Sequence, residues 1–177
     1  VHLTIPVDIQ QQAVSEDEVD FYNPAEYRSS SPLNAPSEAI HAAIELLQGA
    51  SRPIIIAGSA AAYARSGDAL QGLIETTRIP TLTEGDARGL ISDDHQYSYG
   101  FFDAGLNRAA KMLGTADVVV LVGRKQDIIL GYGMSPTISP DAKIIQIDPS
   151  EAEIGRNRGV SLGIVGDIEA IAGQLTE

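Results

Sequence analysis

The chain has 177 residues, a formal net charge of −12, 44% apolar residues and a mean hydropathy near zero. These values predict a single soluble domain with a sizeable core. The negative charge would repel phosphodiester backbones and anionic lipid surfaces, so we expect neither nucleic acid nor a membrane as a partner. The absence of cysteine excludes disulfides, a thiol nucleophile and thiolate metal sites, and it fits a cytoplasmic protein.

The chain begins with Val1, and apolar side chains alternate with polar ones through VHLTIPVDI. This period of two predicts a half-buried strand over residues 1–9. Residues 10–37 are rich in Gln, Glu, Asp, Ser and Pro, which predicts an extended linker anchored by Phe21, Tyr22 and Tyr27. We therefore expect residues 1–36 to be an interdomain strand and linker from a longer chain, and residues 37–177 to be an α/β domain.

Helical and strand patterns alternate through the rest of the chain. A helix is expected to begin at Pro36-Ser37 and to end before Gly49, because apolar residues recur there at helical spacing. Further helical stripes lie at 70–77, 106–113 and 168–175, and apolar runs typical of strands lie at 54–58, 79–83, 118–122, 144–147 and 160–165. Strands that are apolar on both faces and separated by helices predict a doubly wound, mainly parallel sheet with helices on both faces.

Glycines and acids follow several of these strands. In a parallel α/β sheet, ligands bind outside the carboxyl ends of the strands. Those ends are Gly58-Ser59, Gly123-Arg124-Lys125, Ile147-Asp148 and Gly166-Asp167. Glycine allows close approach of the backbone to a ligand, and an aspartate can accept both hydrogen bonds of a ribose diol. Together these positions predict a nucleotide crevice.

Structural interpretations of the same residues remain open. Asp148 precedes Pro149 and can open a turn, while Asp167 is well placed to cap the last helix. Gly58 and Gly123 can simply end strands. Of the basic residues near these positions, only Lys125 is kept as a ligand-binding candidate, since exposed cations are usually solvated surface.

Independent catalytic motifs are absent from the sequence. His2, His41 and His95 are scattered, so no metal site is predicted. Ser59 follows a strand but lacks the flanking glycines of a nucleophile elbow. We predict no catalytic residue, and Glu84 lies in a loop with no motif around it.

The segment KIIQIDPSEAEIGRNRGVSLGIVGD, residues 143–167, places two strands that each end in aspartate around a short acidic turn. It resembles the central domain of thiamine-diphosphate-dependent enzymes, the superfamily of acetolactate synthases and benzaldehyde-lyase-like lyases. The resemblance implies a Rossmann-like central domain, a fragment of a three-domain lyase, carboligase or 2-oxo acid decarboxylase. Thiamine diphosphate and Mg²⁺ would be bound by other domains, so this fragment alone would be catalytically inactive.

The resemblance also bears on the crevice. Acetolactate synthases hold FAD there, with a GARFDDR-like segment and two strand-end aspartates. Gly123, Lys125 and Asp127 match that segment, and Asp148 and Asp167 match the aspartates. The first turn, GSAAAYARSG, departs from the FAD pattern, as does GRKQDII. FAD, ADP or no nucleotide therefore remain as alternatives, with no nucleotide favoured.

The implied partners are the flanking pyrimidine- and diphosphate-binding domains of the same chain, in a homodimer or homotetramer. Two alternatives to the lyase or decarboxylase prediction remain. One is an acetolactate-synthase-type domain that binds FAD. The other is a free-standing nucleotide-binding module, which would have little reason to carry the linker before Ile40.

Overall fold

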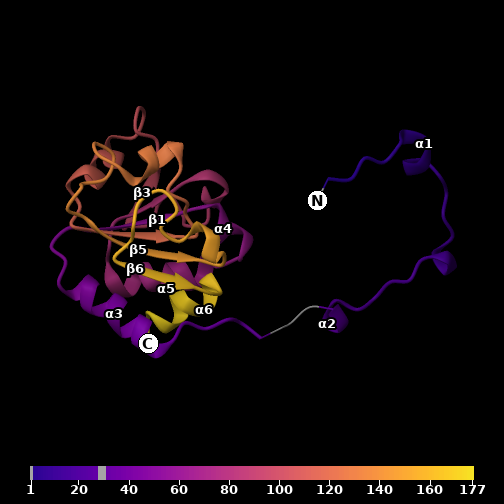
Figure 1. Cartoon of the computed structure of the whole chain (residues 1–177), viewed down its shortest axis with the longest axis horizontal. Helices are drawn as coiled ribbons and strands as arrows, with labels where there is room; N and C mark the ends of the chain where they lie inside the picture. The colour runs from indigo at the N-terminus through magenta and orange to yellow at the C-terminus, as the bar shows by residue number, and fades with distance from the viewer. Residues whose placement is uncertain (1, 28–30) are drawn as a thin grey trace. The chain divides into compact units, whose positions relative to one another are not determined.

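The computed structural model describes residues 2–27 and 31–177. It divides the chain into two units, Val1–Ser31 and Pro32–Glu177 (Figure 1). The second unit holds a six-stranded sheet in the order β3-β2-β1-β4-β5-β6, and every strand pair in it is parallel. The strands are β1 (Pro53–Ala57), β2 (Thr81–Thr83), β3 (Ser98–Phe101), β4 (Val118–Val122), β5 (Lys143–Asp148) and β6 (Leu162–Val165).

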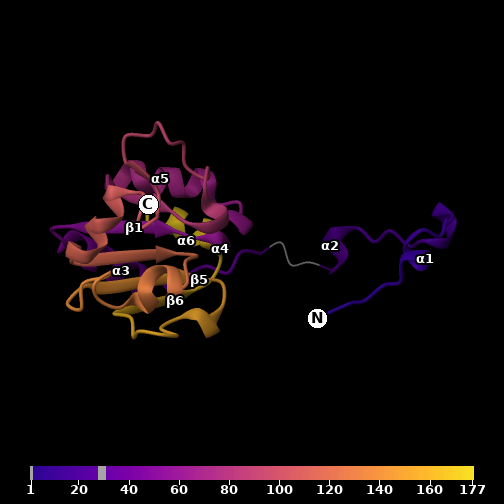
Figure 2. The same ribbon diagram turned by 90° about the horizontal axis from the view of Figure 1, so that it is seen from above.

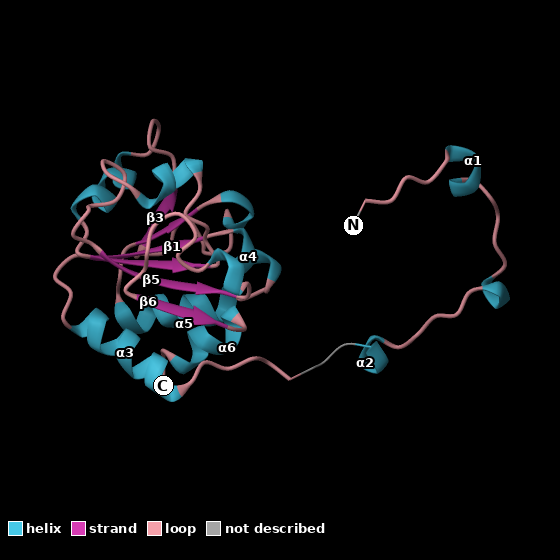
Figure 3. Ribbon diagram, in the orientation of Figure 1, coloured by secondary structure: helices cyan, strands magenta, loops and turns pink. Residues whose placement is uncertain are grey.

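This strand order is that of doubly wound dinucleotide-binding folds, and it confirms the predicted fold class. The chain winds from β1 outward to β2 and β3, and then crosses back to β4 on the other side of β1. The switch point lies between β1 and β4, which pair in register from Pro53 opposite Val118 to Ala57 opposite Val122. Figure 3 shows β1, β5 and β6 running toward the same edge, next to which α4 (Ser59–Tyr63) lies.

Each face of the sheet has its own core, because successive strand residues point to opposite sides. Ile55, Val120 and Ile145 pack with residues of α3 (Ser37–Gln48), α5 (Gly67–Thr77) and α6 (Ile168–Gln174). On the other face, side chains such as Ile54 and Leu121 pack with η3 (Arg108–Thr115) and Leu130 of η4 (Ile128–Gly133). Helices α5 and α6 pack against each other (Figures 1 and 2). The apolar runs thus form central strands that are buried on both sides.

The predicted helix over 106–113 is a 3₁₀ helix that begins at Arg108. Asn107 caps it by accepting a hydrogen bond from the backbone N–H of Ala109, at 2.9 Å. Leu106 lies before this cap and is 91% exposed, so it does not belong to the buried stripe. The second face of the sheet is therefore covered by tight 3₁₀ turns where the first is covered by α-helices.

Several elements were not predicted from the sequence. Strand β3 has the sequence SYGF and only half-buried side chains apart from exposed Tyr99, so its apolar signal is weak. Helix α4 falls in the stretch interpreted as a turn. The short 3₁₀ helices η2 (Gly85–Ala87) and η5 (Glu151–Glu153) follow β2 and β5.

The predicted strand over residues 1–9 is wrong. Residues 2–6 have no regular structure, and Val7–Gln10 form a helical turn, α1; residue 1 lies outside the described residues. Two more short turns follow, η1 (Glu16–Glu18) and α2 (Pro24–Tyr27). A strand needs a hydrogen-bonding partner, and no strand is described in this unit. The expected aromatic anchors are exposed, Phe21 at 81%.

Candidate functional site

A crevice of about 430 Å³ lies at the carboxyl ends of β1, β2, β4 and β5. It therefore sits across the switch point, where this fold class binds ligands. It is lined by Ser59, Ala60, Tyr63, Glu84, Gly85, Gly123, Arg124, Lys125, Asp127, Asp148, Pro149, Ser150 and Glu153. The sequence-based candidates Ser59, Gly123, Lys125, Asp127 and Asp148 come together there.

Two candidates take other places. Gly58 is the residue before α4 and lies beneath the side chain of Arg124. Asp167 caps α6, as the sequence pattern predicts, because its Oδ1 accepts the backbone N–H of Ala170 at 3.0 Å. Its own N–H donates to the carbonyl of Leu33.

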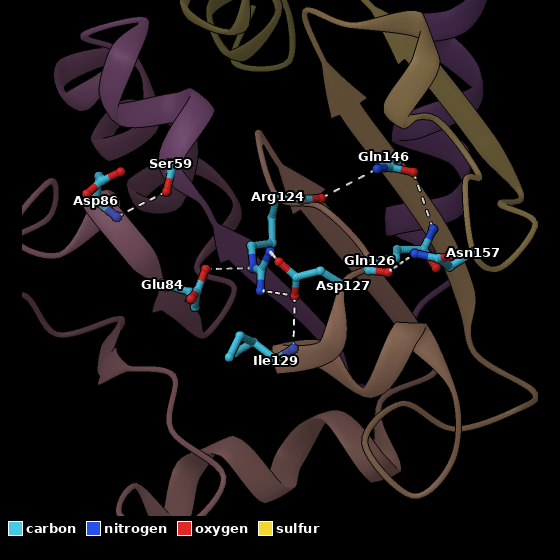
Figure 4. A network of polar contacts seen from close by, with 9 residues as sticks. All are labelled: Ser59, Glu84, Asp86, Arg124, Gln126, Asp127, Ile129, Gln146 and Asn157. Carbon is cyan, nitrogen blue, oxygen red and sulfur yellow. Dashed lines mark hydrogen bonds and ion pairs between the residues drawn. The ribbon is translucent and has the colours of Figure 1, made fainter.

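The centre of the crevice is a charged triad, Glu84, Arg124 and Asp127 (Figure 4). Arg124 is only 3% exposed. Its Nη1 and Nη2 donate to the two carboxylate oxygens of Asp127 at 2.9 and 2.7 Å. Its Nε lies 2.8 Å from Oε2 of Glu84. One guanidinium therefore ties the end of β2 to the loop after β4.

Glu84 was not predicted as a site residue, and the prediction that Arg124 is solvated surface is wrong. Glu84 directly follows β2, so the strand-end rule used for Asp148 would have found it. The burial of Arg124 leaves no such signal, because the sequence does not show which of Arg124 and Lys125 turns inward.

The pKa values of the two acids of the triad are shifted in opposite directions. Burial raises the pKa of Glu84, and the charges of Asp127 and Asp86 add to this while Arg124 opposes it. Burial would also raise the pKa of Asp127, but the hydrogen bonds and charge of Arg124 and the backbone N–H groups of Ile129 and Leu130 outweigh it and lower the pKa. Asp127 is thus the firmly ionised partner of Arg124.

Beside the triad lies an amide network that includes Gln126, Gln146 and Asn157 (Figure 4) and continues to Arg158. Gln146 is fully buried in β5; its amide donates to the carbonyl of Glu153 at 2.9 Å and accepts the N–H of Gly155 at 2.9 Å. Its Nε2 also reaches the carbonyl of Arg124 at 3.4 Å. The network therefore holds the loops after β4 and β5 without paired charges.

Arg158 extends the amide network to the loop around η4. Its guanidinium donates to the carbonyls of Gly133, Pro140 and Ala142 at 2.6, 2.9 and 3.0 Å. Gln126 donates to the carbonyl of Arg158 at 3.0 Å, and its Oε1 has no partner among the described residues. Arg158 therefore has a structural role, because it holds these backbone segments together.

Asp148 is buried at the end of β5. Its Oδ1 accepts the N–H of Ser150 at 2.9 Å, and its Oδ2 has no hydrogen-bond partner in the described structure. Burial raises the pKa of Asp148, with a contribution from Glu153, while the Ser150 N–H and Lys125 oppose the rise. Lys125 itself is 57% exposed and pairs with Glu153 at 3.2 Å.

A larger groove of about 640 Å³ lies at the opposite edge of the sheet, near the start of β4 and β5. Its Asp117 accepts the backbone N–H groups of Ser51 and Arg52 at 2.7 and 2.9 Å. That carboxylate therefore stabilises the turn into β1, and the switch-point crevice remains the better candidate site.

The described residues offer no catalytic constellation of their own. Within residues 2–27 and 31–177, no three His, Cys, Asp or Glu side chains are grouped to hold a metal ion. The hydroxyl of Ser59 accepts the N–H of Asp86 at 3.1 Å. The crevice can bind a ligand or have a structural role, but its described residues include no activated nucleophile.

Comparison with known families identifies the fold. The model for the central domain of thiamine pyrophosphate enzymes matches residues 40–175. The chain belongs to this family. This membership agrees with the resemblance seen in the sequence, and it favours the central-domain prediction over a free-standing module.

Curated relatives agree with this assignment. The chain is 37% identical to a 2-hydroxyacyl-CoA lyase of Arabidopsis thaliana, with 98% of this chain and 30% of the relative covered. It is 31% identical to 2-hydroxyacyl-CoA lyase 1 of Homo sapiens (99% and 29%) and 33% identical to oxalyl-CoA decarboxylase of Escherichia coli K12 (100% and 30%). The chain thus spans about three tenths of the length of these relatives.

A solved structure shows the same fold. A thiamin diphosphate-dependent enzyme from Mycobacterium smegmatis superposes with a TM-score of 0.69 at 21% identity, over 84% of this chain and 29% of that one. Within the part of the chain that the structure describes, no helix has the length and apolar character needed to span a membrane.

Proposed function

We propose that the chain is the central domain of a thiamine-diphosphate-dependent lyase or decarboxylase that acts on acyl-CoA thioesters. The observation that carries the proposal is 37% identity to a 2-hydroxyacyl-CoA lyase over nearly the whole chain. Identity of 33% to an oxalyl-CoA decarboxylase supports the same substrate class. In both relatives' names the substrate is a CoA thioester, a different substrate class from the 2-oxo acid of the decarboxylase that the resemblance implies.

Bound thiamine diphosphate supplies an electron sink for the carbanion released when a bond next to a carbonyl is broken. The described residues do not fit this cofactor or its Mg²⁺. The switch-point crevice is lined by four acidic and two basic side chains, and the described residues contain no grouped metal ligands. We therefore assign both groups to other parts of the enzyme and derive no catalytic step from this chain.

The role that remains for this domain is architectural. Four exposed apolar side chains lie on and just after η4, beside the crevice: Ile128, Ile129, Tyr132 and Met134. Such a cluster supports contact with a flanking domain or with a second subunit of a dimer or tetramer. The cytoplasm remains the proposed compartment, since a chain without cysteine makes no use of an oxidising one.

An acetolactate-synthase-type transferase is the second candidate. The chain is 33% identical to a probable acetolactate synthase large subunit of Methanococcus aeolicus, over 97% of this chain. Substrate choice separates the two candidates, because an acetolactate synthase consumes a 2-oxo acid where a CoA lyase consumes a thioester.

The experiment compares the gene product that contains this chain with the 177-residue chain alone. Each is incubated with thiamine diphosphate and Mg²⁺ and offered a 2-hydroxyacyl-CoA, oxalyl-CoA or pyruvate, and substrate loss is followed by chromatography. We expect cofactor-dependent loss of a thioester by the gene product and none by the chain alone. Loss of pyruvate only would favour the second candidate, and turnover by the chain alone would contradict the proposal.

A further inference from the structure

The turn after β1 is already packed from within the protein. A Cβ at Gly58 would lie 2.7 Å from Cδ of Arg124, so the arginine side chain covers the glycine surface that a ligand would approach. A Cβ at Gly123, where φ is +60°, would lie 2.8 Å from Cδ1 of Ile168 and would also meet the backbone N of Ala61. Both glycines therefore serve internal close packing.

Three backbone donors of this turn, the N–H groups of Gly58, Ala60 and Ala61, are also engaged. In dinucleotide-binding folds, N–H groups at the start of the first helix receive the diphosphate. Here the N–H of Ala60 donates to the carbonyl of Gly123 at 3.2 Å, and that of Ala61 donates to the carbonyl of Gly58 at 2.9 Å. The N–H of Gly58 donates to Val122. The turn is thus bound to the end of β4.

The basic side chains of the crevice are paired as well. Arg124 is held by Glu84 and Asp127, and Lys125 is held by Glu153. The crevice lining carries four acidic side chains against these two basic ones. A diphosphate would therefore meet neither a free cation nor a positive potential.

From these contacts we infer that the side chain of Arg124 itself closes the switch-point crevice to FAD, ADP and other diphosphates. Its guanidinium links the end of β2 to the loop after β4, and its Cδ packs over Gly58 at the end of β1. Dinucleotide-binding relatives of the fold bind a nucleotide at this position. Arg124 is thus a specificity-determining residue. The inference goes beyond the proposed function, and because it concerns binding to this chain alone, it can fail while the proposed reaction stands.

Isothermal titration calorimetry with ADP, FAD and inorganic pyrophosphate added to the 177-residue chain tests whether Arg124 closes the crevice. We expect no saturable binding of any of the three up to millimolar concentration. Saturable binding of ADP or FAD by the unmodified chain would overturn the inference.

A double variant, Glu84→Gln with Asp127→Asn, keeps Arg124 and removes both of its carboxylate partners. A released guanidinium makes charge-assisted hydrogen bonds to phosphate, so we expect pyrophosphate to bind about tenfold or more tighter than to the parent. The control, Glu38→Gln with Asp68→Asn, removes the same charge from exposed positions in the first turns of α3 and α5. It should show no gain.

A second variant provides the test if the double variant is not folded, as shown by the absence of cooperative unfolding. Glu153→Gln releases Lys125 and Arg156, which pair with the same carboxylate oxygen at 3.2 and 3.1 Å. We again expect a gain in pyrophosphate binding over the parent. If no folded variant gains affinity, or if the control gains as much, internal pairing is not what closes the crevice and the inference is wrong.

Discussion

Two polar networks lie side by side at the carboxyl edge of the sheet, and they differ in how they are neutralised. The charged triad balances a buried guanidinium with two carboxylates of opposite pKa shift. The amide network joins the neighbouring loops through neutral amides and through an arginine that donates only to carbonyls. The charged triad can therefore respond to pH and, by our inference, exclude anions, whereas the amide network can only hold its loops in place.

The largest effect is expected from Arg124→Ala, which leaves Glu84 and Asp127 without their cation. Breaking a buried ion pair on one side costs about 3 kcal/mol of unfolding free energy. In the variant Glu84 loses the charge that opposes the rise of its pKa by burial, and Asp127 loses the charge and hydrogen bonds of Arg124 that lower its pKa. The penalty of the two unpaired carboxylates is therefore absent at low pH and appears as the pH rises. Urea denaturation should therefore show a loss that is full at neutral pH and shrinks toward about pH 4. A loss that does not change with pH would break the comparison, and exposed Arg156→Ala is the control.

Gln146→Leu should come next. It removes the buried amide and leaves the carbonyl of Glu153 and the N–H of Gly155 unsatisfied, which costs about 2 kcal/mol. Because no charge is removed, the loss should be constant from about pH 5 to 8 in the same denaturation measurements. Gln71→Leu, an exposed change on α5, serves as the control. A pH-dependent loss would mean that the two networks are not separate.

Asp148→Asn should stabilise the protein. The folded-state pKa of Asp148 is raised above its ordinary value of 3.8. The parent therefore loses stability as the pH rises from this ordinary value to the folded-state pKa. The variant carries no such penalty, so we expect a gain of about 1 kcal/mol at neutral pH. Near about pH 3 the parent carboxyl is protonated and the gain should vanish. Thermal unfolding at both pH values checks this, and destabilisation at neutral pH would show that the Asp148 charge has a partner.

The smallest effect is expected from Lys125→Ala. Its ammonium group is exposed, and Glu153 keeps Arg156 at 3.1 Å after the change. The loss should be below about 0.5 kcal/mol, since exposed ion pairs contribute little. A loss comparable to that of Arg124→Ala would show that burial does not determine how much a basic side chain of the crevice contributes to stability.

Much of the fold could be predicted from periodicity, because the central strands are apolar on both faces and α3, α5 and α6 carry clear stripes. The same rule failed for residues 1–9. Their apolar side chains alternate with a period of two, but no partner strand is described within their unit. Strand β3 was missed since it pairs at the sheet edge with only half-buried side chains.

The candidate site was predictable only in part. The strand-end rule indicated Ser59, Gly123, Lys125 and Asp148, and the family resemblance added Asp127. The structure brings these residues together, and their ligand-binding role remains a prediction. The rule could not show that Arg124 folds back over Gly58, because this depends on the contacts of three strand ends at once.

The central claim is that this domain closes its own crevice and acts as a scaffold. The most direct measurement is a crystal structure of the chain grown with several millimolar ADP. We expect Arg124 packed on Gly58 and paired with Glu84 and Asp127, with no nucleotide at the switch point. Arg124 displaced from Glu84, with a diphosphate bound against the Gly58 turn, would contradict it.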